Sequence, residues 1–170
     1  MIHKTAIINS KAKISSSVEI GPYTVIGPDV EIDDDVIIQS HVNITGNTKI
    51  GKKNIFYPMS SIGSDPQDLK YKGEKTSLKI GDGNTIREHV TINTGTIQDE
   101  GITKIGNNNL IMIGAHIAHD CTVGNNIVMA NNSAIAGHAV IEDFVIIGAK
   151  CGIQQFVRIG KLAMTGGMTG

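Results

Sequence analysis

The sequence predicts an all-β protein: a parallel β-helix of triangular coils, built from six-residue repeats and interrupted by two extruded loops. Three observations predict this fold. An aliphatic residue recurs every six positions, a small or β-branched residue precedes it by two, and turn-forming Gly, Asn and Asp follow it. A helix cannot keep one face apolar at a period of six, because 3.6 residues per turn rotate the stripe away from the core. The period therefore indicates a solenoid of short strands and tight corners.

The recurring aliphatic positions begin at Ile2 and continue almost to the end of the chain. They are Ile2, Ile8, Ile14, Ile20, Ile26, Ile32, Ile38, Ile44, Ile50, Phe56 and Ile62, then Ile80, Ile86 and Ile92, then Ile105, Ile111, Ile117, Val123, Met129, Ile135, Ile141, Ile147, Ile153 and Ile159. Side chains two apart in a strand point to the same face, so each aliphatic residue and the small residue before it should both point inward. The Gly, Asn and Asp residues that follow tolerate positive φ and suit corners. Three hexapeptides make one coil, and coils stack at the strand spacing of about 4.8 Å.

Two breaks in the repeat predict the loops. Between Ile62 and Ile80 the in-phase positions would be Asp68 and Glu74, charges that a dry core does not accept unpaired, so residues 63–79 should loop out. A second insertion, at about 93–104, adds seven residues. When each loop is counted as an insertion at one corner, five core positions fall on one edge of successive coils: Ile62, Ile92, Ile117, Ile135 and Ile153. Both loops should therefore project from the same column of corners.

Composition narrows the class of protein. The 170 residues fit one domain, residues 1–170, which can bury a core without metal or disulfide support. A net charge of −1 and a pI near 6.6 disfavour a nucleic-acid partner. The sequence shows neither a long apolar segment nor a secretion-signal pattern, so we expect no integral membrane segment and a cytoplasmic location. Cys121 and Cys151 lack paired spacing and are expected in the core.

The stretch "AHIAHDC", residues 115–121, is the richest in titratable side chains, and it lies on the edge that bears the loops. The second position after the core aliphatic holds His119, Gly137 and Gln155 in successive coils, and the third holds Asp120, His138 and Phe156. Stacked coils should bring His119 within roughly 5 Å of Gly137, backbone to backbone. An imidazole, with an unperturbed pKa near about 6.5, can accept a proton when a carboxylate orients it. A glycine N–H can donate to an oxyanion. The residues indicate a general-base site, and the alternative is a solvated polar corner.

Five motifs together make the chain resemble the UDP-N-acetylglucosamine acyltransferases of lipid A biosynthesis. They are "QDLKYKGE" at 67–74, "IRE.VTI" at 86–92, "AHIAHDC.VG" at 115–124, "AGH" at 136–138 and "QF..IG" at 155–160, in register over nearly the whole chain. The resemblance implies left-handed coils and a homotrimer. It also implies transfer of a 3-hydroxyacyl chain from acyl carrier protein to the glucosamine 3-hydroxyl of UDP-N-acetylglucosamine, the first step of that pathway. The donor brings its own phosphopantetheine, and neither a further cofactor nor a metal is expected.

The same resemblance assigns roles to single residues. It makes His119 the general base, Asp120 its support and the N–H of Gly137 the oxyanion donor. Substrate-lining positions are Asp68, Lys70, His116, His138 and Gln155. Gly167 matches the acyl-chain ruler, where a glycine leaves room for a longer chain.

The chain departs from the family pattern at three points. Gln154 and Asn93 stand where the family often has histidine, which affects the expected substrate preference. The family also continues into further coils and a C-terminal helical domain, which we expect to be absent from these 170 residues.

Three alternatives stay open at this stage. The first is a zinc hydrolyase of the γ-carbonic-anhydrase kind, using His116, His119 and His138, although it leaves both loops unexplained. The second is a non-catalytic hexapeptide scaffold, which accounts for the solenoid but not for loops and histidines on one edge. The third is a related sugar-nucleotide acyltransferase, including one whose acceptor bears a 3-amino group.

Overall fold

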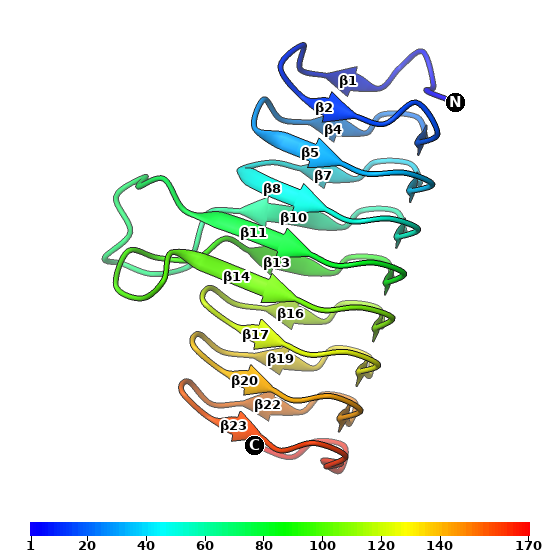
Figure 1. Cartoon of the computed structure of the whole chain (residues 1–170). Helices are drawn as coiled ribbons and strands as arrows, with labels where there is room; N and C mark the ends of the chain where they lie inside the picture. The colour runs from blue at the N-terminus through cyan, green and yellow to red at the C-terminus, as the bar shows by residue number, and fades with distance from the viewer.

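The computed structural model describes residues 1–170 and contains 23 short strands and no helix. The chain winds around one axis, with the N-terminus at one end of the stack and the C-terminus at the other (Figure 1). Each strand from β1 to β20 pairs in parallel with the strand three elements later, so each turn of the chain adds one strand to each of three sheets. The predicted parallel β-helix of hexapeptides is therefore confirmed. No helix capable of spanning a membrane occurs in it.

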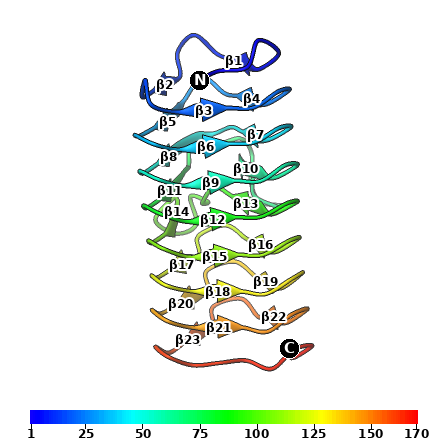
Figure 2. The same cartoon turned by 90° about the vertical axis from the view of Figure 1, so that its right-hand side faces the viewer.

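The three sheets form the three faces of a triangular prism. The first sheet contains β1 (Ile7–Ile8), β4 (Val25–Ile26), β7 (Asn43–Ile44), β10 (Ser61–Ser64), β13 (Thr91–Asn93), β16 (His116–Ile117), β19 (Ala134–Ile135) and β22 (Gly152–Ile153). The second contains β2 (Lys13–Ile14), β5 (Val30–Ile32), β8 (Asn47–Ile50), β11 (Ser77–Ile80), β14 (Ile102–Ile105), β17 (Thr122–Val123), β20 (Val140–Ile141) and β23 (Arg158–Ile159). The third contains β3 (Glu19–Ile20), β6 (Ile37–Ile38), β9 (Ile55–Phe56), β12 (Thr85–Ile86), β15 (Leu110–Ile111), β18 (Val128–Met129) and β21 (Ile146–Ile147), and faces the viewer in Figure 2.

The core is the column of predicted aliphatic residues. Ile44, Ile62 and Ile92 pair directly with one another along the first sheet, and each is fully buried. Phe56, also fully buried, is the largest of these side chains. Small inward residues such as Val36 and Val42 close the corners beside them. All these residues belong to one continuous hydrophobic cluster, because each coil alone has no second layer to bury its inner face.

The corners differ from the expectation that Gly, Asn and Asp would make them. Sixteen non-glycine residues adopt positive φ, and all but Met168 are the third residue after a core position. They include Tyr23, His41 and Phe156, side chains that rarely adopt this conformation. The N–H of such a residue donates to the preceding coil, as from His41 to the carbonyl of Pro22 at 2.9 Å. This repeated bond between coils offsets the local cost, so the stack imposes the corner on almost any residue.

Both loops leave the corner between the first and second sheets, here named the loop corner. Residues 65–76 connect β10 to β11, and residues 94–101 connect β13 to β14 (Figure 1). Each extruded segment is shorter than the sequence estimates of 63–79 and 93–104. The difference arises because Leu78 and Thr103 already lie at buried inward positions of the second sheet.

Candidate active site

The loop corner stacks the candidate residues in adjacent coils. The strands before them are in register, with Ile117 opposite Ile135 and Ile135 opposite Ile153. Two further bonds hold the corner itself: the N–H of His138 donates to the carbonyl of His119 at 3.1 Å, and that of Phe156 to Gly137 at 3.2 Å. The structure therefore brings His119, Asp120, Gly137 and His138 to one place.

His119 and Asp120 form a hydrogen-bonded pair although they are neighbours in sequence. His119 Nδ1 lies 2.9 Å from Asp120 Oδ2, and each residue is only 7% exposed. In a straight strand the two side chains would point to opposite faces. Asp120 instead has φ of 59°, and this left-handed corner brings its carboxylate to the same side as the imidazole. His119 Nε2 has no hydrogen-bond partner within the chain, so that nitrogen can serve a substrate.

The imidazole of His119 lies directly against the backbone of Gly137. A Cβ atom at position 137 would lie 2.6 Å from Cε1 and 2.8 Å from Nε2 of His119, far inside van der Waals contact. Glycine is therefore required for the observed ring position. The N–H of Gly137 donates to no acceptor in the chain. A bare N–H beside a general base is the arrangement needed to stabilise an oxyanion.

Asp120 is held by a residue that the sequence did not single out. Thr96, in the loop 94–101, donates its backbone N–H to both carboxylate oxygens at 2.9 and 3.0 Å, and its hydroxyl to Oδ2 at 2.6 Å. The N–H of Asp120 donates to Thr103 Oγ1 at 2.9 Å. No spacing rule pointed to Thr96, because its position depends on the path of a loop that lies outside the repeat.

His138 is oriented by the same loop. Its Nδ1 lies 2.8 Å from Asp99 Oδ2, and this hydrogen bond holds the pKa of Asp99 below its usual range. The ring stacks on Phe156 with centroids 4.5 Å apart, and it meets His119 edge to face at 5.1 Å. The aromatic contacts and Asp99 together fix the plane of the ring.

His116 lies on the outer face of β16, three residues before His119, which lies at the loop corner. Its Nδ1 shares a 2.7 Å hydrogen bond with Thr91 Oγ1 of the neighbouring strand β13. Burial, and secondarily the charge of His119, lower the pKa of His116. A neutral imidazole at this position is suited to hydrogen bonding with substrate rather than to ion pairing.

Two open cavities meet at His119. One, of about 530 Å³, runs along the first sheet. It is lined by Gln67, His116, Ala118, His119, Ala134, Ile135, Ala136, Gly137, Gly152, Ile153, Gln154, Gln155 and Gly170. The other, of about 730 Å³, lies beside the two loops and is lined by Gln67, Asp68, Leu69, Lys70, Gln98, Asp99, His119, His138, Gln155 and Phe156. The first has a floor of small side chains, whereas the second is polar. Both have the volume of small-molecule sites.

Two residues from the sequence analysis lie outside these cavities. Gly167 lines neither of them, and a Cβ atom at this position would meet only the backbone of Ala149, at 3.4 Å. Asn93 is buried and donates its side-chain N–H to the carbonyl of Asp65 at 2.9 Å. Asn93 therefore anchors the start of the first loop, a structural role in this chain.

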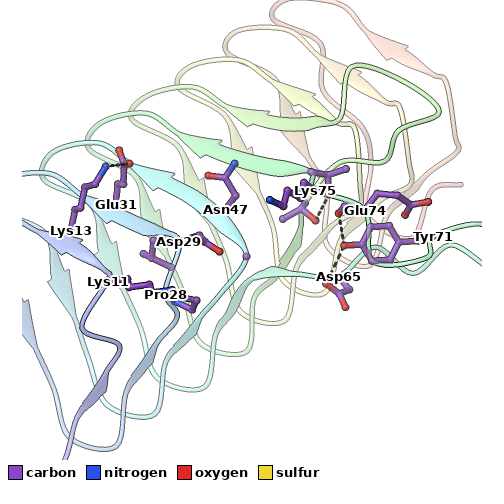
Figure 3. Close-up of a pocket in the computed structure, with 14 residues that line it drawn as sticks. Lys11, Lys13, Pro28, Asp29, Glu31, Asn47, Asp65, Tyr71, Glu74 and Lys75 are labelled. Carbon is purple, nitrogen blue, oxygen red and sulfur yellow. Dashed lines mark hydrogen bonds and ion pairs between the residues drawn. The ribbon is translucent and has the colours of Figure 1, made fainter.

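A third cavity, of about 480 Å³, lies at the N-terminal side of the loop 65–76 (Figure 3). Its walls bear charges of both signs, and one pair of them is in contact: Lys13 Nζ lies 2.8 Å from Glu31 Oε1. The Tyr71 hydroxyl donates to the carbonyl of Glu74 at 3.1 Å. Burial raises the pKa of Tyr71, so this phenol stays neutral. The cavity has no histidine or cysteine in its lining, and His119 is not part of it.

A metal could in principle use the same cluster, since side-chain atoms of His119, Asp120 and His138 lie within 4.8 Å of one another. Part of this cluster is already engaged within the chain. Asp120 accepts three hydrogen bonds from Thr96, and its Oδ2 also bonds to His119 Nδ1. His116, the third histidine weighed as a zinc ligand, bonds to Thr91 instead. The hydrogen bonds account for the cluster as it stands.

Comparison with known proteins supports a single relationship. The family described as "Bacterial transferase hexapeptide (six repeats)" matches residues 11–46 and 102–137. Among solved structures, LpxA from Acinetobacter baumannii is 49% identical over 98% of this chain and 65% of its own, with a TM-score of 0.96. UDP-N-acetylglucosamine O-acyltransferase (LpxA) from Moraxella catarrhalis is 52% identical over 98% of this chain and 65% of its own, with a TM-score of 0.95. LpxA, a UDP-N-acetylglucosamine acyltransferase from Bacteroides fragilis, is 39% identical over 96% and 69%, with a TM-score of 0.79.

These superpositions extend over almost the whole chain, so the coils have the left-handed sense of the hexapeptide-repeat fold. The chain spans about 65% of the length of the Acinetobacter and Moraxella proteins.

Proposed function

Because the chain belongs to the UDP-N-acetylglucosamine acyltransferase family, as its motifs indicated, we propose that it transfers a 3-hydroxyacyl chain to UDP-N-acetylglucosamine. The donor is the thioester of acyl carrier protein, the acceptor is the 3-hydroxyl of the glucosamine ring, and the step begins lipid A biosynthesis. One observation supports this most directly. His119 has Nδ1 bound to Asp120 and lies with Nε2 beside the unpaired N–H of Gly137.

In the proposed reaction, His119 Nε2 takes the proton of the sugar hydroxyl as its oxygen attacks the thioester carbonyl. The carbonyl oxygen becomes an oxyanion and accepts the N–H of Gly137. The intermediate then collapses, the carbon–sulfur bond breaks, and the departing pantetheine thiolate takes the proton back from His119. Asp120 stabilises the imidazolium formed between these steps. General-base assistance of this kind contributes roughly 10²- to 10⁴-fold in rate.

The two cavities suit the two substrates. The polar cavity beside the loops, with Lys70, Asp68 and His138 in its wall, is proposed for the sugar nucleotide, because a lysine suits phosphate. The cavity along the first sheet, floored by Ala134 and Gly152 near Gln155, is proposed for the acyl chain. Gly167 remains the proposed ruler, and since it lines neither cavity, it can contact an acyl chain only where another subunit extends the groove.

We propose a homotrimer, as the family resemblance implies. The outward positions of the third sheet are mostly aliphatic: Ile37, Ile55, Leu110, Val128 and Ile146. The outward positions of the second sheet are mostly charged: Lys13, Glu31, Lys49, Lys79, Lys104 and Arg158. The third sheet thus presents a mostly apolar face, interrupted by Thr85 and ended by Glu19, beside a charged one, and this favours burial of the apolar face between copies. Sedimentation equilibrium should give three times the mass of one chain, and a stable monomer would contradict the proposal.

Acyl carrier protein is proposed as a transient partner, and a cytoplasmic location is proposed with it. The mechanism uses no resident cofactor or metal, because proton transfer and oxyanion binding are assigned to His119 and Gly137. Dialysis against a chelator should therefore leave the rate unchanged. A rate that depends on zinc would instead favour the zinc-hydrolyase alternative.

The experiment that tests the function measures transfer from 3-hydroxyacyl carrier proteins of several chain lengths to UDP-N-acetylglucosamine. His119→Ala should abolish transfer. His3→Ala, which removes an exposed histidine in the first coil, should not change it. A folded protein that transfers no acyl group from any donor, or one indifferent to His119, would favour a scaffold. Preference for an acceptor bearing a 3-amino group would identify a related acyltransferase.

A further inference from the structure

One residue of the loop 94–101, Thr96, is linked to His119, the proposed base, through Asp120. Thr96 is completely buried, and it places three hydrogen bonds on the carboxylate of Asp120. The hydroxyl bond, at 2.6 Å, ends on Oδ2, the same oxygen that receives His119 Nδ1 at 2.9 Å. The orientation of Asp120 is thus set by Thr96, and the orientation of His119 is set by Asp120.

This chain of bonds also selects a tautomer. A carboxylate accepts and cannot donate, so the bond to Oδ2 places the proton of neutral His119 on Nδ1 and leaves Nε2 bare. A bare Nε2 is the form that can remove a proton from a substrate. If the carboxylate turned away, the imidazole would lose both its orientation and its preferred tautomer.

The loop is built to hold Thr96 in place. A side chain at Gly95 would collide with the backbone of Gly101 and Ile102 and with Asp120 Oδ1, so the two ends of the loop close tightly at this point. The N–H of Gly95 donates to the carbonyl of Ser77 at 3.1 Å. Further along the loop, Asp99 binds His138, so the same eight residues orient both histidines. A loop that only spanned two strands would need none of these contacts.

We infer that Thr96 is a positioning residue, which acts through Asp120 to keep His119 in the tautomer with a bare Nε2. The effect on turnover rests on the proposed function, whereas the effect on the tautomer does not. Thr96 touches no cavity that could hold substrate, so its influence on the reaction passes through Asp120.

The test compares Thr96→Val and Thr96→Ala with Thr96→Ser. Valine removes the hydroxyl while keeping size and backbone, alanine removes it without adding a methyl group, and serine restores it. Thr48→Val is the matched control. Thr48 is also fully buried and its hydroxyl also donates a hydrogen bond, but the acceptor is the nearby carbonyl of Thr45, in a coil away from Asp120. Thermal unfolding of all four variants identifies any that fail to fold.

Two readouts are measured on each folded variant. The imidazole nitrogen chemical shifts of His119 report the tautomer, and steady-state kinetics report kcat and KM. Thr96→Val and Thr96→Ala should mix the tautomers and lower kcat about 10-fold, with KM changing less than about twofold, as expected for one lost charge-assisted hydrogen bond. Thr96→Ser and Thr48→Val should match the unmutated chain in both.

Unchanged tautomer shifts in Thr96→Val and Thr96→Ala would overturn the inference, as would an increase in KM alone, which would show direct contact with substrate. Failure of serine to rescue the shifts would also overturn it, since the hydroxyl is the only group restored. If the chain transfers no acyl group at all, the proposed function fails. The nitrogen shifts then still decide the role of Thr96.

Discussion

Replacing Gly137 with alanine tests the geometry of the site at a single atom. The new Cβ would lie 2.6 Å from Cε1 of His119, and ordinary contact begins at about 3.4 Å. The imidazole must therefore move by about 0.8 Å, because the atoms on the other side of the contact are backbone. A displacement of this size exceeds the range of about 0.5 Å over which N–H···O hydrogen bonds form, so the 2.9 Å Nδ1–Oδ2 bond that orients the ring should be weakened or lost.

Misplacing a catalytic group by about 1 Å can cost about 10²-fold in rate, so we expect kcat of Gly137→Ala to fall by about that factor. The free energy of unfolding should fall moderately. Losing the hydrogen bond costs about 1.5–3 kcal/mol, and alanine returns about 0.4–1 kcal/mol through the unfolded chain, because φ at this position is not in the left-handed region. The variant should thus unfold about 1–2 kcal/mol more easily while remaining folded.

The assay is acyl transfer to UDP-N-acetylglucosamine under saturating donor, with urea unfolding measured in parallel. Gly160→Ala is the matched control, because a Cβ at Gly160 meets nothing within 4 Å. Wild-type kcat in folded Gly137→Ala would refute the reasoning, since it would show that the imidazole does not need its present position. An equal loss of rate in Gly160→Ala would show that the effect is not local.

Three further predictions concern stability and reactivity. Asp99→Asn should lower Tm near neutral pH, and this loss of Tm should become smaller as the pH falls. The folded pKa of Asp99 is held below its usual value of about 3.8, so the ionised carboxylate stabilises the folded chain above that value. This stabilisation is lost at lower pH, where the carboxylate binds a proton. A difference in Tm that is independent of pH would contradict this. Phe56→Ala should lower the free energy of unfolding by about 3–5 kcal/mol, because Phe56 is fully buried. Urea unfolding measures this, and Phe144→Ala is the control: Phe144 is 46% exposed, so its loss should lower the free energy of unfolding far less. Burial raises the pKa of Cys121 to about 12, so iodoacetamide should label this thiol only in denaturant. Mass spectrometry locates the label, and rapid labelling of Cys121 in the native chain would show that the core opens.

The sequence by itself determined the solenoid and the location of the site. The six-residue period identifies which side chains point inward, because inward packing requires an apolar residue at each repeat. Counting that period also placed both loops and His119 on one edge, since strands such as β13 and β16 stack in register. Burial of Cys121 and Cys151, expected because they lack paired spacing, is also confirmed.

Only the tertiary structure decided how the site is held. The sequence pattern favoured Gly, Asn and Asp at corners, yet Phe156 and His138 adopt positive φ because hydrogen bonds between coils enforce it. Thr96 lies 24 positions from Asp120, within a loop that the repeat does not govern. Periodic patterns predict contacts where the backbone repeats its geometry. The conformation of a loop outside the repeat depends on its own turns and on where its ends meet. Its contacts with Asp120 and His119 are therefore seen only in the folded structure, where the coils have stacked.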